Sequence, residues 1–404
     1  MKRKLILFIL AAIFVAVSTS RASQRDRMQK IVDVALGKYH TLCLFEDGRI
    51  LSFGNNENGE LGLGEFFLGE RYIPPFYIQV PIKFVSIASG YFHSLAVSED
   101  GTLWGWGDNS SCQLINSERN FSKSCIESEY NIPVIIDSGK DWRKVFADGF
   151  DSFGLKKDGT LWRISDMYQI ENPKGRKWKN IIVQADGGGD DYKLYVILED
   201  KKGEIFTYGT CNEEKNTLSC FSVWRSEKGD SKILLPLEIP PETSDLWMSD
   251  FSGVFRKRNE IHIWGMTVTD ENEIKKKFKS MFSDIRKSEE IFADWMLKSK
   301  KKVKIKKSKK IISGNFMWSF ACIGGTEFNY SYTACLQNDG KLIVWSNGKT
   351  YTSDSLKIRD IWGNNGIFAQ AEDGKIYVTG YNLFNRLGVD KSQEEFLFLE
   401  LFDF

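Results

Sequence analysis

The stretch ALGKYHTLCLFEDG at residues 35–48 returns as ASGYFHSLAVSEDG at residues 88–101. Both copies run from a Gly-x-x-His group through an apolar segment to an acidic residue and a glycine. In both, the two glycines are eleven positions apart, Gly37 and Gly48 in the first copy and Gly90 and Gly101 in the second. Such self-similarity predicts a repeat architecture, in which each unit buries its apolar face only against its neighbours.

Seven turn positions extend this repeat along the chain. Each is a glycine or asparagine that lies six residues before another small residue: Gly48, Gly101, Gly159, Gly203, Asn259, Gly340 and Gly374. Five of the seven directly follow an aspartate. Asp-Gly between apolar runs predicts a hairpin with a type I′ turn, in which both central residues have positive φ. The uneven spacing of the turns predicts connections of different length on a fixed frame of seven units.

The strands after three of the turns lead into a second shared pattern. GNNENGELG at 54–62 and GYNLFNRLG at 380–388 share their Gly, Asn and Leu positions, and GDNSSCQLI at 107–115 keeps the Asn and the Leu. An Asn two residues after a Gly suits a tight connection, since Asn tolerates left-handed backbone and bonds its own main chain.

These patterns resemble the repeat of the regulator of chromosome condensation family, which combines Gly-x-x-His, an acidic-Gly turn and a closing Leu-Gly. The resemblance spans about residues 31–390. It is close in repeats one and two, lacks the His in repeat seven, and is weak in repeats three to six. It implies an all-β fold, a seven-bladed β-propeller. It also implies a structural role for the following repeat residues: Gly37, His40, Gly48, Gly54, Gly90, His93, Gly101, Gly107, Gly363, Gly374 and Gly380.

The C-terminal stretch FLFLELF at residues 396–402 has the character of a strand. An open ring of blades would expose sheet edges, and the first repeat begins close to the N-terminus, at Ile31. We therefore expect residues 396–402 to complete the first blade beside Ile31.

The connection between repeats five and six breaks the propeller pattern. From Ile274 to Met296 apolar residues follow helical spacing, and nine lysines lie within residues 298–310, so we expect one helical and basic insertion over 267–310. It is interpreted either as a helix packed on the propeller and followed by a solvated basic strand or tether, or as a docking element for an acidic partner or a membrane surface. The second interpretation assigns these contact residues: Phe292, Trp295, Lys300, Lys301, Lys302, Lys304 and Lys306.

Residues 1–22 have the pattern of a secretory signal peptide. Lys2, Arg3 and Lys4 precede an apolar run over residues 5–17, and small residues permit cleavage after Ala22. As a helix the run spans about 20 Å, short of the roughly 30 Å bilayer core. We predict an exported protein, secreted or periplasmic, formed by residues 23–404. An uncleaved membrane anchor is the alternative.

Export permits disulfides, and seven cysteines leave at least one unpaired. Cys43 and Cys335 fall on predicted buried strands, where a free thiol behaves as a small apolar group. Two pairs lie between predicted strands and could close loops: Cys112 with Cys125, and Cys211 with Cys220.

Composition argues against several classes of function. The 55 basic and 54 acidic residues give a net charge of +1, so no global field favours nucleic acid. No Cys/His cluster has zinc spacing, and neither a metal nor a cofactor is expected. We expect a monomeric, non-enzymatic propeller that binds a protein, with membrane contact through the basic insertion as a further option.

Three alternatives stay open at this point. The resemblance implies guanine-nucleotide exchange on a small GTPase, although a signal peptide directs the chain away from cytosolic partners. Some secreted bacterial members of the family inhibit an extracellular enzyme. An enzyme on this scaffold would need acids, Tyr, Arg or His gathered at one end of the propeller channel.

Overall fold

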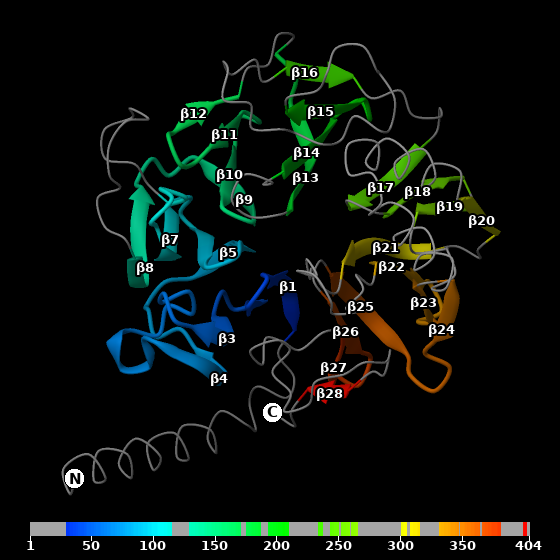
Figure 1. Cartoon of the computed structure of the whole chain (residues 1–404), viewed down its shortest axis with the longest axis horizontal. Coiled ribbons are helices and arrows are strands. Elements are labelled where there is room, and N and C mark those ends of the chain that lie inside the picture. The colour runs from blue at the N-terminus through cyan, green and yellow to red at the C-terminus, as the bar shows by residue number, and fades with distance from the viewer. Residues whose placement is uncertain are drawn as a thin grey trace, which may run out of the picture.

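The computed structural model describes residues 30–114, 129–170, 175–186, 193–209, 233–236, 243–249, 252–258, 260–265, 300–304, 308–315, 331–346, 348–363, 366–380 and 399–401. Their strands form seven four-stranded antiparallel sheets, which stand around a common axis as the blades of a propeller (Figure 1). The predicted all-β seven-bladed propeller is therefore confirmed. Residues 1–29, with the predicted signal peptide, and 266–299, with the predicted helix, lie outside the described residues.

Each blade is built from four strands in chain order, the first next to the axis and the fourth at the rim (Figure 1). Blade one holds a short 3-10 helix, η1 (Glu65–Phe67), and the strands β1 (Ile31–Leu36), β2 (His40–Phe45), β3 (Ile50–Asn56) and β4 (Glu70–Tyr77). Blade two holds β5 (Phe84–Ser89), β6 (His93–Ser98), β7 (Leu103–Asp108) and β8 (Glu129–Asp137). Blade three holds β9 (Trp142–Asp148), β10 (Asp151–Lys156), β11 (Leu161–Arg163) and β12 (Tyr168–Gln169).

The remaining four blades follow the same order. Blade four holds β13 (Trp178–Asp186), β14 (Lys193–Asp200), β15 (Ile205–Gly209) and β16 (Ile233–Pro236). Blade five holds β17 (Thr243–Ser249), β18 (Ser252–Lys257), β19 (Glu260–Gly265) and β20 (Lys300–Lys304). Blade six holds β21 (Ser308–Asn315), β22 (Ser331–Gln337), β23 (Leu342–Ser346) and β24 (Lys349–Thr352). Blade seven holds β25 (Ile358–Gly363), β26 (Ile367–Ala371), β27 (Ile376–Thr379) and β28 (Leu399–Leu401).

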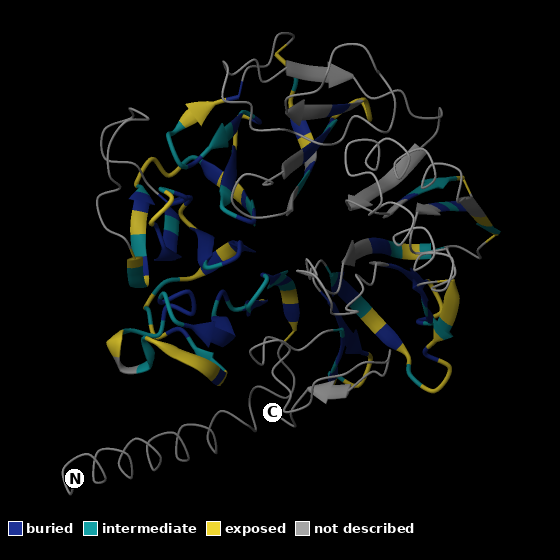
Figure 2. Cartoon of the chain, viewed as in Figure 1, coloured by how far each residue is buried: buried dark blue, intermediate teal, exposed yellow. Residues whose placement is uncertain are grey.

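The second strands form the most buried layer of the ring. Every residue of β2, β6 and β26 is buried, because a middle strand has neighbouring blades on both of its faces. Figure 2 shows buried residues along the inner strands and exposed residues towards the turns and the rim. Burial on both faces explains why these strands read as nearly continuous apolar runs in the sequence.

The Asp-Gly hairpin turns differ from the predicted type I′ geometry. In blade one, Gly48 N–H donates to Phe45 O at 2.9 Å, and Gly48 has φ of 88° while Asp47 stays outside the left-handed region. This is a type I turn followed by a left-handed glycine, the other common hairpin connection. The aspartate has a different role, because Asp47 Oδ1 accepts the Arg49 N–H at 3.1 Å. The type I′ prediction was wrong, since Asp-Gly serves both turns.

The ring closes without an exchange of strands between blades one and seven. The C-terminal strand β28 pairs with β27 and forms the outer edge of blade seven. Blade one is complete with β1 to β4. The prediction that residues 396–402 complete blade one was therefore wrong. Packing closes the ring instead, because Phe53 of blade one and Phe368 of blade seven share one apolar cluster, with ring centroids 6.1 Å apart.

The basic half of the predicted insertion belongs to the blades. Lys300–Lys304 form β20, the rim strand of blade five, which pairs with β19. Ser308–Asn315 form β21, the axial strand of blade six. The insertion boundary of 310 was therefore wrong, and the segment between β19 and β20 is 266–299. The run of lysines hid two strands, since charged residues on a sheet edge do not show the apolar alternation by which strands are recognised.

The chain direction gives the propeller two unlike faces. Hairpin turns such as that at Gly48, and the links from one blade to the next, lie at one end of the sheets, which we call the turn face. Connections from first to second and from third to fourth strands lie at the other end, the loop face. The longest connections all begin and end there: β7 to β8, β15 to β16, β19 to β20, β21 to β22 and β27 to β28.

Candidate binding surface

The two repeat histidines connect neighbouring blades. Buried His40 of blade one has its Nε2 2.8 Å from Oγ of Ser94 in blade two. The Ser94 hydroxyl itself donates to the Glu60 main-chain oxygen at 2.8 Å, so His40 Nε2 carries the proton and donates. His93 repeats the contact with Ser152 of blade three, also at 2.8 Å. Burial lowers the pKa of His40 to about 3 and that of His93 to about 4, which keeps both rings neutral.

A tyrosine takes the same place in blade six. Tyr332 lies eight residues before the turn residue Gly340, as His40 lies eight before Gly48. Its hydroxyl donates across to Gly366 O of blade seven at 2.8 Å. The sequence interpretation missed this residue, because the repeat pattern was searched for His. Counting back from each turn glycine would have found it.

The Gly54–Gly62 segment fastens blade one to blade two. The main-chain oxygen of Glu60 accepts hydrogen bonds from Trp106 Nε1 at 2.9 Å and from Ser94 Oγ. Its carboxylate accepts from Asn55 Nδ2 and, at 2.8 Å, from Asn58 N–H. Burial raises the pKa of Glu60 to about 7, and the hydrogen bonds only partly oppose this. We assign this segment to the frame of the propeller.

The repeat glycines fall into three sets. Turn glycines with positive φ are Gly48, Gly101 and Gly374, and glycines with positive φ near the end of a third strand are Gly54, Gly107 and Gly380. Glycines at or next to the loop-face end of a first strand, where a Cβ would have no room, are Gly37, Gly90 and Gly363. At Gly90, a Cβ would lie 2.7 Å from Gly149 O and 2.2 Å from His93 Cε1, so any side chain there would push blades two and three apart.

The predicted contact residues of the insertion separate into two groups. Lys300, Lys301, Lys302 and Lys304 lie on β20, and of these Lys302 and Lys304 are exposed. Lysines on a rim strand discourage pairing with another chain, which gives this group a structural explanation. Phe292, Trp295 and Lys306 lie outside the described residues.

The cysteines also divide. Cys43 and Cys335 are buried and free, as expected for thiols on inner strands. Cys112 is disulfide-bonded, whereas Cys125, its predicted partner, lies outside the described residues. Cys211 and Cys220 lie outside them as well, so both pairings stay predictions.

Every first strand has an irregularity at its turn-face end, beside the axis. There the ladder to the second strand skips one residue in six blades and two in blade five. A bulge leaves the extra residue unpaired and redirects its side chain. The skipped residues of the six blades are all exposed: Val32, Val85, Arg143, Lys179, Lys309 and Arg359.

Charges on several first strands act on one another around the axis. Burial raises the pKa of Asp33 on β1, while Lys144 of β9 and Lys310 of β21 oppose the rise. Blades one and three are not neighbours in the ring, so the interaction of Asp33 with Lys144 indicates that both side chains lie near the axis.

Four of the cations at the turn-face ends of the first strands differ from Lys179 and Lys310. Lys310 pairs with Asp360 at 3.1 Å, and Lys179 pairs with Glu199 at 2.6 Å. Arg143, Lys144, Lys309 and Arg359, which we call the axial cation cluster, form no ion pair with any described residue. Lys309 donates to the main-chain oxygen of Arg359 at 2.5 Å, and the Lys144 ammonium lies 5.1 Å from the Phe146 ring centroid.

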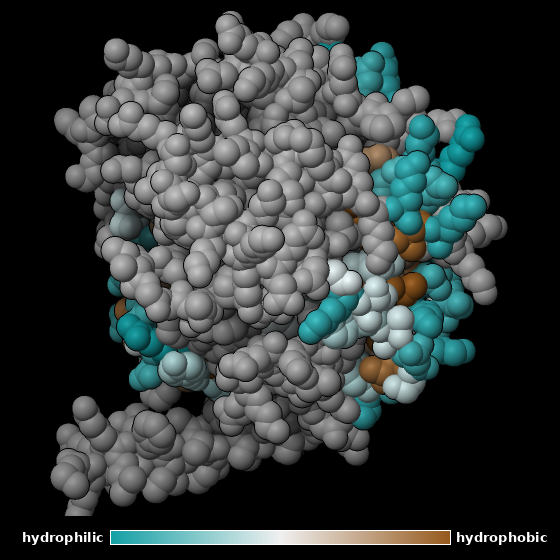
Figure 3. Space-filling view, turned by 45° about the vertical axis from the view of Figure 1, so that its right-hand side comes forward, coloured by the Kyte–Doolittle hydropathy of each residue, from teal (hydrophilic) through white to brown (hydrophobic). Residues whose placement is uncertain are grey.

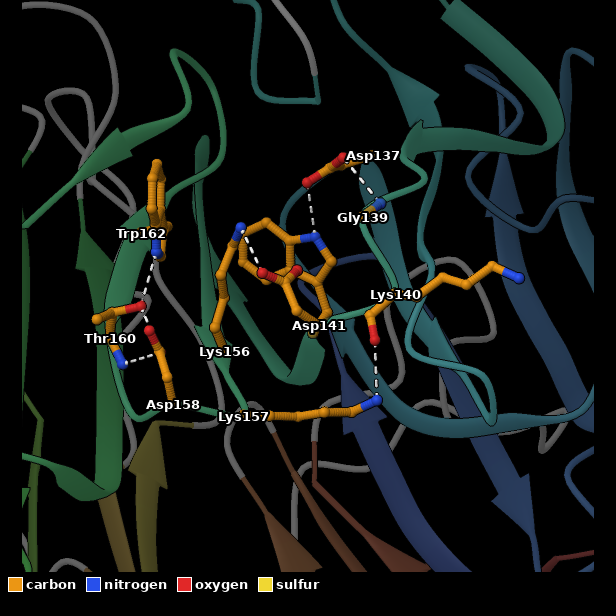
Figure 4. A network of polar contacts seen from close by, with 10 residues as sticks. Asp137, Gly139, Lys140, Asp141, Lys156, Lys157, Asp158, Thr160 and Trp162 are labelled. Carbon is orange, nitrogen blue, oxygen red and sulfur yellow. Dashed lines mark hydrogen bonds and ion pairs between the residues drawn. The ribbon is translucent and has the colours of Figure 1, made fainter.

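A polar network holds the blade-three side of this cluster in place (Figure 4). Asp137 accepts a hydrogen bond from Trp142 Nε1 at 2.9 Å, which fixes the start of β9. Lys156 pairs with Asp141 at 3.0 Å, and its ammonium lies 4.7 Å from the Trp142 ring and 4.5 Å from the Trp162 ring. Arg143 follows Trp142 directly, so its main chain is anchored although its side chain is exposed.

Candidate metal sites and membrane-spanning helices are absent from the described part of the chain. It contains no group of three or more His, Cys, Asp or Glu residues placed to hold a metal ion. Within the same residues, no helix has the length and apolar character needed to cross a membrane. The surface coloured in Figure 3, mainly on its right-hand side, is mostly hydrophilic, with hydrophobic side chains between.

Comparison with known proteins agrees with the repeat pattern. The regulator of chromosome condensation (RCC1) repeat matches residues 31–60 and 84–113, and a second description of the same repeat matches residues 47–97. Human "Probable E3 ubiquitin-protein ligase HERC6" is 33% identical over 139 residues, which cover 34% of this chain and 13% of that protein. Mouse "Regulator of chromosome condensation" is 27% identical over 219 residues, which cover 48% of this chain and 51% of that protein. The matched part of the chain thus spans about half or less of the length of these relatives.

Among solved structures, human WBSCR16 has a similar fold. Its crystal structure matches with a TM-score of 0.60 at 13% identity, over 88% of this chain and 94% of that one. At this identity the likeness concerns the arrangement of the blades alone.

Proposed function

We infer that this chain, whose first two blades carry repeats of the regulator of chromosome condensation family, is a non-enzymatic propeller that binds a protein partner outside the cell that makes it. A propeller of this kind supplies a rigid frame, and the contacts of His40, His93 and Tyr332 fasten its blades to one another. The partner is then bound by the connections between strands, which this frame holds in place.

The contrast between the two faces is the observation that carries the proposal. At the turn face, strands are joined by tight hairpins, and those hairpins are bonded to the next blade, as in the 2.9 Å bond from Phe84 N–H to Gly48 O. At the loop face, five connections are far longer than a four-stranded blade requires. Long connections gathered on one side of a rigid frame are the usual means by which repeat folds bind macromolecules.

Affinity capture with the full mature chain, followed by calorimetry on the purified pair, tests the binding proposal. We expect a stoichiometric protein complex that the double variant Phe292→Ala, Trp295→Ala weakens by about tenfold or more, since aromatic side chains dominate interfaces. The variant Tyr72→Ala removes an exposed aromatic ring from β4 and serves as the control with unchanged affinity.

Two results would contradict this function. One is accelerated nucleotide release from small GTPases, which would favour the exchange activity implied by the family resemblance. The other is turnover of a captured molecule by the purified chain, which would favour an enzyme.

Export is part of the same proposal and is supported by the basic and apolar pattern of residues 1–22. We expect the protein recovered from the exported fraction to begin at Ser23, as measured by N-terminal mass spectrometry. The variant Ile9→Arg interrupts the apolar run and should keep the chain inside the cell. An exported protein that retains Met1 would instead indicate an uncleaved anchor.

A further inference from the structure

We propose that the turn-face end of the propeller axis binds a short peptide segment that is both acidic and aliphatic, through the axial cation cluster and two exposed valines. This rests on the proposed function, since the segment would belong to the protein partner, and it names a second contact region opposite the loop face.

The cluster is built by the fold and does not arise from an excess of basic residues. The net charge of the chain is only +1, yet bulges place Arg143, Lys309 and Arg359 at equivalent positions in three blades. Two other lysines of the turn face do have acidic partners, Lys140 with Asp100 and Lys341 with Asp354. Unpaired cations on a folded surface offer a carboxylate group charge-assisted hydrogen bonds.

The same structural position is apolar in blades one and two. Val32 and Val85 are the skipped residues there, and they are 41% and 53% exposed. The end of the axis is therefore apolar on one side and cationic on the other. A ligand that matches both sides carries carboxylates and aliphatic groups on neighbouring residues.

This pairing favours a peptide over a nucleic acid. A phosphate backbone requires a continuous basic track, and its affinity grows with the number of phosphates neutralised. Here the unpaired cations at the first strands lie on β9, β21 and β25, and valines occupy the equivalent positions of blades one and two. An acidic peptide of a few residues matches this limited area.

The test measures fluorescence anisotropy of the full mature chain with labelled peptides of about twelve residues that combine Glu, Asp and Leu. We expect saturable binding that disappears when the acids are replaced by Gln and Asn. The double variant Arg143→Glu, Arg359→Glu should raise Kd by about tenfold or more. The control Lys140→Glu, Lys341→Glu makes the same charge change at lysines that already have acidic partners and should alter Kd by less than about twofold.

A third variant examines the apolar side. Val32→Ser with Val85→Ser should weaken the Leu-containing peptide and leave an acidic peptide with Ser in place of Leu unaffected. Equal melting temperatures of all variants verify that they fold, as expected for exposed residues.

Several outcomes would overturn the proposal. One is a Kd that the reversal of Arg143 and Arg359 leaves unchanged. Another is preferential binding of a single-stranded oligonucleotide or of phosphatidylserine vesicles, lost in the same variant, which would make the cluster a phosphate site. A captured partner that binds the Arg143→Glu, Arg359→Glu chain normally would exclude this contact and leave the proposed function standing.

Discussion

At the scale of single residues, blades one and two contain the same buried polar pair with its chemistry exchanged. In blade one Asn55 donates to the Glu60 carboxylate, which also accepts Asn58 N–H. In blade two Gln113 donates to Asp108 at 2.7 Å, and its amide oxygen accepts Ser111 N–H at 2.9 Å. Amide and carboxylate change places while the loop geometry stays the same. The longer side chain of the pair is therefore an ionisable carboxyl in blade one and a neutral amide in blade two.

The exchange predicts the effect of Glu60→Gln. Burial raises the pKa of Glu60 to about 7 from its ordinary value of 4.5, so between these pH values the folded state binds more protons than the unfolded one. Its contribution to the free energy of unfolding therefore falls as the pH rises through this range, by about 3 kcal/mol at most, since each pKa unit is worth about 1.4 kcal/mol. A neutral amide at this position should remove this loss and stabilise the protein at pH 8.

Urea unfolding at pH 5 and pH 8 measures this effect. The variant Gln113→Glu is the matched control: it places a second carboxylate beside Asp108 and should destabilise the protein more at pH 8 than at pH 5. A Glu60→Gln variant that keeps the full pH dependence of the wild type would refute the assignment to this residue.

Individual residues were predictable where the repeat preserved their type. His40 and His93 stand out because both follow Gly-x-x. Tyr332 performs the same bridging with a different group, a hydroxyl in place of an imidazole N–H, so a search by residue type passes over it. The axial cation cluster was missed for a related reason: Arg143, Lys309 and Arg359 share a position created by a bulge, which leaves no signature in the sequence.

At the scale of elements, the hairpin turn has two roles in blades one, two and six. Its glycine allows the left-handed end of a type I turn, and its carbonyl accepts a main-chain N–H from the next blade, as Gly101 O accepts from Trp142 at 3.1 Å. A side chain at the turn glycine therefore has two separate costs. The left-handed backbone is unfavourable at every such glycine, whereas a steric clash of the added Cβ with the next blade arises at only some of them.

Alanine at two equivalent turns makes that separation. Gly101 has φ of 95°, and a Cβ there would lie 2.4 Å from Lys140 O. Gly203 in blade four has φ of 81° and no atom within 4 Å of such a Cβ. Gly203→Ala should lower the free energy of unfolding by about 1 kcal/mol, the cost of a left-handed backbone at alanine. Gly101→Ala should lower it by clearly more, because the link between blades two and three must also move. Chemical unfolding measures both, and equal losses would contradict the crowding argument.

The elements that sequence reasoning misplaced are those at the edges of sheets. β20 is formed mainly of lysines and lacks the alternation of a half-buried strand. β28 was predicted as a strand but was assigned to the wrong blade. Both are held by a single neighbouring strand, and that pairing is a tertiary contact which local patterns do not report. The middle strands, buried on both faces, were found from the sequence without difficulty.

At the scale of the whole molecule, the closure of the ring depends on side-chain packing between blades seven and one. Phe53 and Phe368 are fully buried in the cluster that joins them. The number of blades was predictable, since each contributes one turn glycine or asparagine, whereas the mode of closure was not, because it depends on contacts between the two ends of the chain.

Removal of either ring tests this closure. Phe53→Ala and Phe368→Ala should each lower the free energy of unfolding by about 3–5 kcal/mol, the usual cost of a large cavity. Because the two rings touch, the double variant should lose less than the sum of the single losses. Thermal and urea unfolding of all four proteins measure this coupling, and strictly additive losses would contradict closure through this contact.

Closure by packing also means that every blade is one uninterrupted stretch of chain. β28 ends at the rim of blade seven and β1 begins at the axis of blade one, the same step that residues 78–83 make between β4 and β5. A linker of similar length could join the two ends, and new termini could then be opened between any two blades. The ring thus has no privileged starting point, and circularly permuted chains or the duplication of a whole blade would leave each sheet intact.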